Sequence, residues 1–98
     1  YLDDITSFYL LDKEIKVHLT PGHSAGSVCF EIDNMLISGD TLFKDSLGRT
    51  DLPGGNKELL KQSVKFILDN FMNYHVYPGH GSTFILDEEV INRIEKLL

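Results

Sequence analysis

Three short glycine-bearing loops, each at the end of an apolar run, constrain this chain more than any other feature. They are Thr20-Pro21-Gly22-His23, Ser38-Gly39-Asp40 and Tyr77-Pro78-Gly79-His80-Gly81. Each loop carries a histidine or an aspartate, which are ligands suited to zinc, iron or manganese. The neighbouring glycine permits the close backbone approach that a metal-bound cluster needs. Because loops at strand ends can meet at one edge of a sheet, the pattern predicts a metal site shared by the three loops.

Alternation of apolar and polar residues predicts several short strands. In the clearest one, Ile15, Val17 and Leu19 share one face, and His18 falls on the polar face as an ordinary surface or packing histidine. Cys29, in the middle of another strand, is interpreted as a small buried apolar residue. The predicted strands cover residues 8–11, 14–19, 27–32, 35–37 and 73–77.

Two helices are predicted from apolar residues at helical spacing. Asn56 is a good N-cap for a helix over residues 57–69, and Asp87 caps a final helix through Leu97. Residues 41–55 between strand and helix are rich in loop-forming residues. With a polar lead-in at the start and no repeat or linker, the order of elements predicts one α/β layered domain over residues 1–98.

Composition excludes several classes of function. The 98 residues carry a net charge of -6, which disfavours nucleic acid or an anionic membrane as partner, and no span is apolar enough for a membrane helix. One cysteine rules out an internal disulfide and favours a reducing compartment, so we expect a cytoplasmic protein. The chain begins at Tyr1 rather than methionine, and we interpret it as a piece of a longer product.

Four motifs in order resemble the metallo-β-lactamase superfamily, and within it the glyoxalase II-like (hydroxyacylglutathione hydrolase-like) branch. They are the stretches 20–27 and 38–43, Gly48-Arg49-Thr50-Asp51, and Tyr77-Pro78-Gly79-His80-Gly81. The resemblance implies an αββα sandwich, of which this chain would be the carboxy-terminal half. That half would be a mixed, largely antiparallel sheet with helices on one face.

The resemblance also implies a site with two divalent metals, zinc first, with iron or manganese as alternatives. His23 would be the third histidine of the first metal position, and His80 would ligate the second metal. Asp40 would bridge both metals and act in catalysis through them. A hydroxide held between the metals would attack a small-molecule thioester of the acyl-glutathione type. No serine or cysteine nucleophile is needed.

One part of the family pattern is absent from this chain. The other family ligands come from a His-x-His-x-Asp-His motif in an amino-terminal half, and the histidines here are His18, His23, His75 and His80. We therefore expect the chain alone to be inactive. A lone half also exposes one apolar sheet face, so we expect it to self-associate through that face. His75 lies outside the ligand loop and is interpreted as structural.

Three further residues could support the site. Arg49 and Asp51 flank the site loop, either as a surface ion pair or loop anchor or as groups that orient a ligand. Tyr77 either reaches the site or packs against the sheet. Ser24 and Ser27 are expected to brace their own turn.

Two other functions stay open. A mononuclear iron dioxygenase acting on persulfides belongs to the same superfamily, and Gly48-Arg49-Thr50-Asp51 resembles both branches. The third loop favours the hydrolase. The chain could also be a non-catalytic module that keeps the scaffold, although three intact ligand loops argue against that interpretation.

Overall fold

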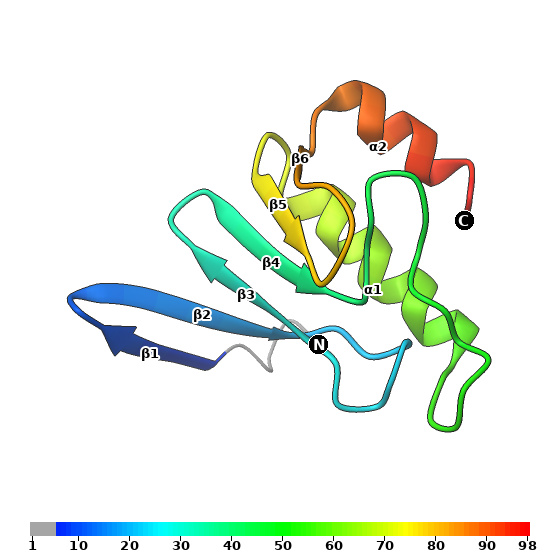
Figure 1. The fold of residues 1–98 in the computed structure, drawn as a ribbon, viewed down its shortest axis with the longest axis horizontal. Helices are drawn as coiled ribbons and strands as arrows, with labels where there is room; N and C mark the ends of the chain where they lie inside the picture. The colour runs from blue at the N-terminus through cyan, green and yellow to red at the C-terminus, as the bar shows by residue number, and fades with distance from the viewer. Residues whose placement is uncertain (1–5) are drawn as a thin grey trace.

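A computed structural model describes residues 6–98, so the first five residues of the predicted polar lead-in lie outside the described part (Figure 1). Six strands form one mixed sheet in the order β1-β2-β3-β4-β5-β6, which confirms the α/β class. The strands are β1 (Thr6–Leu10), β2 (Lys13–Leu19), β3 (Val28–Ile32), β4 (Met35–Gly39), β5 (His75–Pro78) and β6 (Phe84–Ile85), and the helices are α1 (Lys57–Asn70) and α2 (Glu88–Glu95).

The path of the chain brings the ends of two strands together. Neighbouring strands are antiparallel except β4 and β5, which run parallel. A parallel pair needs a long crossover, which here contains α1. Gly39 at the end of β4 therefore lies opposite Pro78 at the end of β5. The loops that carry Asp40 and His80 leave the sheet at the same edge.

Both predicted helix caps are present. The Asn56 side chain accepts a hydrogen bond from the amide of Leu59 at 3.0 Å, and the Asp87 carboxylate accepts one from Val90 at 3.0 Å. These bonds satisfy amide groups that the first turn of a helix leaves free. Helix α2 ends two residues earlier than predicted. The strand β6, which the sequence did not indicate, pairs with β5 through Phe84 and Val76.

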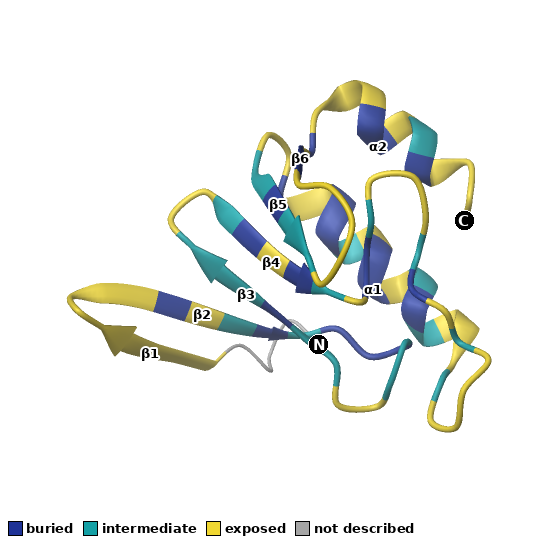
Figure 2. Ribbon diagram, viewed as in Figure 1, coloured by how far each residue is buried: buried dark blue, intermediate teal, exposed yellow. Residues whose placement is uncertain are grey.

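The core lies between one face of the sheet and the helices. Figure 2 shows buried residues on α1, on α2 and on β4, whereas β1 is exposed along its length. Burial of these apolar side chains is the main contribution to the stability of the fold. The most deeply buried side chains are Leu36, Leu42, Val64, Ile67, Val76, Leu86 and Ile94.

His18 lies on the face of the sheet that α1 covers, which confirms the packing alternative of its interpretation and not the surface one. Its ring is 5% exposed and packs against Phe66 and Phe71, with ring centroids 5.7 and 5.3 Å away. Its Nε2 atom is 2.8 Å from a carboxylate oxygen of Glu31, whose other oxygen accepts a hydrogen bond from Tyr74. His18 is a packing histidine, because this shared carboxylate lets a polar ring enter the core.

Within residues 6–98, no helix covers the opposite face of the sheet (Figure 1). Val17, Phe30, Ile37 and Tyr77 pair in one row across four strands, and we call the surface around this row the open sheet face. Ile37, near its centre, is 38% exposed. An apolar face of this kind is unusual for a monomer and is typical of an interaction surface. Neither helix in the described part has the length and hydropathy to cross a membrane.

Candidate metal centre

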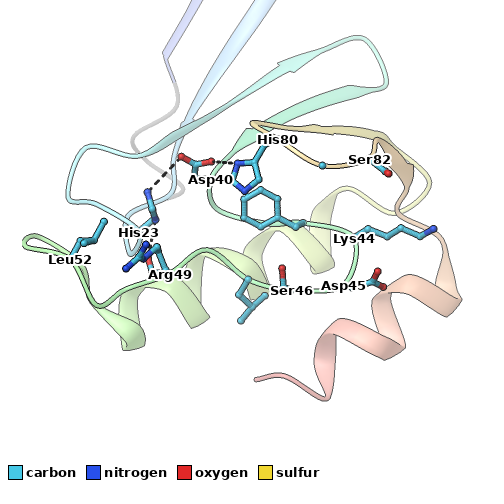
Figure 3. A pocket seen from close by; sticks show the side chains of 12 residues that line it. His23, Asp40, Lys44, Asp45, Ser46, Arg49, Leu52, His80 and Ser82 are labelled. Atoms are coloured by element: carbon cyan, nitrogen blue, oxygen red, sulfur yellow. Dashed lines mark hydrogen bonds and ion pairs between the residues drawn. The ribbon is translucent and has the colours of Figure 1, made fainter.

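The three predicted ligand loops line one pocket. Its volume is about 650 Å³, and His23, Asp40 and His80 all contribute to its wall (Figure 3). The structure therefore brings together side chains that lie as far apart as residues 23 and 80 in the sequence. The remaining lining residues are Phe43, Lys44, Asp45, Ser46, Leu47, Arg49, Leu52, Gly81 and Ser82.

His23 is held in one orientation by the loop beside it. Its Nδ1 atom lies 2.8 Å from the backbone carbonyl oxygen of Arg49. A carbonyl can only accept, so Nδ1 carries the proton and donates it. In the neutral ring Nε2 then has its lone pair available, and it faces the carboxylate of Asp40 at 3.6 Å. This is the arrangement in which metal-binding histidines are usually found.

Asp40 lies between the two histidines. One of its oxygens is 3.6 Å from Nε2 of His23, and the other is 3.4 Å from Nδ1 of His80 (Figure 3). Each carboxylate oxygen therefore lies near a different histidine ring. A carboxylate that bridges two metal ions has the same arrangement. Within residues 6–98, no group of three or more His, Cys, Asp and Glu side chains is arranged to hold a single metal ion. The histidines occupy separate positions on either side of Asp40.

Two glycines make this close approach feasible, as the loop composition predicts. A Cβ atom at Gly48 would lie 1.9 Å from the backbone oxygen of Asp40. A Cβ atom at Gly79 would lie 2.8 Å from the Asp40 carboxylate. A larger residue at Gly48 therefore requires the Asp40 backbone to move, whereas one at Gly79 requires the Asp40 carboxylate to shift.

Arg49 supports the site through its backbone, whereas its side chain pairs with Asp51. The guanidinium donates to the two carboxylate oxygens of Asp51 at 2.8 and 2.9 Å, and both side chains are exposed. These hydrogen bonds raise the pKa of Arg49 and lower the pKa of Asp51. The surface ion pair is therefore present, and the contact of Arg49 with His23 comes from its backbone carbonyl and not from its guanidinium.

Tyr77 and His75 lie apart from the pocket. Their rings stack with centroids 4.6 Å apart, and the Tyr77 hydroxyl is 3.5 Å from Nδ1 of His75. Neither residue lines the pocket, so the structure gives the packing role for Tyr77 and no contact for a supporting role. Ser24 and Ser27 bond each other within their own turn, with hydroxyl oxygens 2.9 Å apart, as predicted.

Phe43 contacts the candidate site, although a phenylalanine cannot bind a metal and was not predicted as a site residue. Its ring lies over His80 with centroids 4.6 Å apart and an interplanar angle of 39°. Together with Leu47 and Leu52 it gives the pocket an apolar wall. The only sequence signal was its position three residues after Asp40, inside a ligand loop.

The sequence matches known proteins over most of its length. A family model described as the metallo-beta-lactamase superfamily matches residues 2–80. A probable metallo-hydrolase of Streptococcus pyogenes serotype M6 is 46% identical over 85 residues, which is 81% of this chain and 36% of the relative. The chain therefore spans little more than a third of the length of that relative.

Solved structures share the fold. The protein TTHA1623, crystallised in a di-iron-bound form, superposes with a TM-score of 0.78 at 35% identity, covering 93% of this chain and 45% of the other. ETHE1 from Myxococcus xanthus superposes with a TM-score of 0.79 at 27% identity, covering 86% of this chain and 40% of the other. The six-stranded sheet and its two helices match one part of each of these larger chains.

Proposed function

This chain belongs to the metallo-β-lactamase superfamily, and from that membership we propose that it supplies one wall of a two-metal hydrolase site. In this proposal His23 binds the first metal, His80 binds the second, and Asp40 bridges them. The observation that carries the proposal is the position of Asp40, whose two oxygens face two different histidines at 3.6 and 3.4 Å. The remaining ligands would come from an amino-terminal segment carrying His-x-His-x-Asp-His.

The donor set fits divalent metals of intermediate hardness. Imidazole nitrogen and carboxylate oxygen are ligands for zinc, iron and manganese. Zinc is our first expectation, and the di-iron form of TTHA1623 supports iron as an alternative. Bound metals of this kind polarise a carbonyl and bring the pKa of a bound water towards neutrality. The chain's own contribution is to fix the orientation of His23 through the Arg49 carbonyl.

The pocket beside the ligands suits a small thioester. Phe43, Leu47 and Leu52 offer apolar surface for an acyl group, and Lys44 places a positive charge beside them. An acyl-glutathione conjugate has both an apolar acyl part and anionic carboxylates. These features support a thioesterase of the glyoxalase II-like branch, and the name of the streptococcal relative supports a metallo-hydrolase in general.

A persulfide dioxygenase with one iron remains the alternative within the superfamily. The structural similarity to ETHE1 keeps it open. The separate positions of His23 and His80 on either side of Asp40 favour the two-metal hydrolase. Metal analysis separates the two, because the dioxygenase would hold a single iron.

The test is thioester hydrolysis by this chain joined to an amino-terminal segment that carries His-x-His-x-Asp-His. We expect the longer polypeptide to hydrolyse acyl-glutathione thioesters and His80→Ala to abolish the activity. The matched control is His75→Ala, which alters a histidine outside the pocket and should retain most of the activity. Persulfide oxidation without thioester hydrolysis would contradict the proposal.

A further inference from the structure

The wall of the pocket beside His80 is formed by a short exposed segment, Phe43 to Ser46, which we call the rim loop. It is closed by a bridge between Leu42 and Leu47 and by a hydrogen bond from the amide of Phe43 to the carbonyl of Ser46 at 2.9 Å. Leu42 is fully buried, so the base of the loop is anchored in the core. The side chains at its tip, Lys44 to Ser46, are exposed.

One ion pair ties the rim loop to a distant helix. Arg93 of α2 donates from one nitrogen to the Asp45 carboxylate and from the other to Glu89 at 3.3 Å. These hydrogen bonds, that to Asp45 foremost, raise the pKa of Arg93. Among the described residues, the Asp45–Arg93 bond is the only side-chain hydrogen bond from the rim loop to another part of the molecule. A planar guanidinium held by two carboxylates is a geometrically specific anchor.

At the other end of the rim loop, Phe43 contacts His80, a candidate metal-binding residue. The Phe43 ring lies against the His80 ring with centroids 4.6 Å apart, and the His80 side chain is 77% exposed. Apart from Phe43, the side chain that restrains the His80 ring is Asp40, at 3.4 Å. A ring held on only two sides depends on both of them for its orientation. Movement of the rim loop would therefore release His80.

We propose that Arg93 is a positioning residue for His80. By fixing Asp45 it holds the rim loop in place, and the loop holds Phe43 against the His80 ring. The value of this positioning for a metal rests on the proposed function, whereas the coupling itself is a property of this chain alone. It is therefore testable without metal or activity.

The test uses NMR spectroscopy of the 98-residue chain. In Arg93→Gln, we expect the His80 ring signals to move towards their free-peptide positions and the contact between the Phe43 and His80 rings to weaken. Because an exposed ion pair shifts a local equilibrium by up to about five-fold, amide exchange at Phe43 should accelerate by up to about that factor. The matched control is Lys65→Gln, which breaks an exposed pair with Asp69 on α1.

Two further variants separate positioning from a general effect on α2. Asp45→Asn leaves the Arg93–Glu89 contact in place and should reproduce the changes at His80. Exchange of the two charges, D45R with R93D, should restore the wild-type signals. Unchanged His80 signals in Arg93→Gln would overturn the proposal. So would changes that Asp45→Asn does not reproduce, or equal changes in Lys65→Gln.

Discussion

His23 donates its Nδ1 proton to the backbone carbonyl of Arg49 across 2.8 Å, and this single bond sets which nitrogen faces Asp40. The two residues lie 26 positions apart, on different loops. Because the acceptor is a backbone atom, the relationship depends on the path of the chain through Gly48 and Arg49 more than on the Arg49 side chain. Substitutions that alter the backbone path should therefore change the orientation of the His23 ring more than substitutions that alter surface charge.

The first prediction concerns Gly48→Ala. The added methyl would meet the Asp40 backbone oxygen at 1.9 Å and His23 Cβ at 3.4 Å, so the ligand loops must separate. We expect a loss of about 1–3 kcal/mol in the free energy of unfolding, measured by urea denaturation. Gly26→Ala is the control, since nothing lies within 4 Å of that position, and it should change stability by less than about 0.5 kcal/mol. Equal effects in both variants would contradict the packing argument.

The second prediction concerns the partly buried network of His18, Glu31 and Tyr74. Glu31→Ala leaves the His18 Nε2 atom and the Tyr74 hydroxyl without their shared acceptor. Unmade hydrogen bonds of buried groups cost about 1–3 kcal/mol, and we expect a destabilisation of that size in urea denaturation. Lys13→Ala breaks an exposed ion pair with Asp33 and should cost less than about 1 kcal/mol. A Glu31→Ala variant with the wild-type free energy of unfolding would show that the network does not stabilise the fold.

The third prediction is a pH dependence from Cys29. Burial raises the pKa of its thiol from 9.0 to about 11. The folded state therefore keeps the proton in a range where the unfolded state releases it. Below pH 9 the thiol is protonated in both states and does not change the free energy of unfolding. Between pH 9 and about 11 the unfolded state releases the proton first, so the free energy of unfolding falls as the pH rises. Urea denaturation at pH 7, 9 and 10.5 should show a steeper loss for the wild type than for Cys29→Ala, and parallel curves would refute the assignment.

The fourth prediction is self-association through the open sheet face. Ile37 lies in the row with Val17, Phe30 and Tyr77 and is 38% exposed. We propose that copies of the chain associate there, and that Ile37→Lys weakens the association because a charge would be buried. Met72→Lys, at an exposed apolar residue after α1, is the control. Light scattering at micromolar concentration should show the difference, and a wild-type monomer would contradict it.

The sequence predicted the elements that carry local signals. Asn56 and Asp87 marked both helix starts because capping depends on residues three positions apart. The three ligand loops were predicted from their glycines, and the structure brings them to one pocket. The two-residue strand β6 was missed because Phe84–Ile85 is too short to show alternation.

Contacts between residues that are distant in sequence could not be predicted from local sequence patterns. Alternation in β2 separated His18 from Val17 correctly, but it could not tell that α1 covers the His18 side. The choice depends on Glu31 and Tyr74, which are distant in sequence. Asp45 and Arg93 lie 48 positions apart, and no local pattern links them. Tertiary pairing decided these contacts.

The most direct test of the two-metal account is the metal content of this chain joined to an amino-terminal segment that carries His-x-His-x-Asp-His. Elemental analysis after dialysis should give two metal ions per molecule, since Asp40 is proposed to serve both positions. Asp40→Ala should lower the content at both positions, whereas His80→Ala should lower it by one ion. A wild-type polypeptide that folds and holds no metal, or an Asp40→Ala variant with unchanged content, would contradict the account.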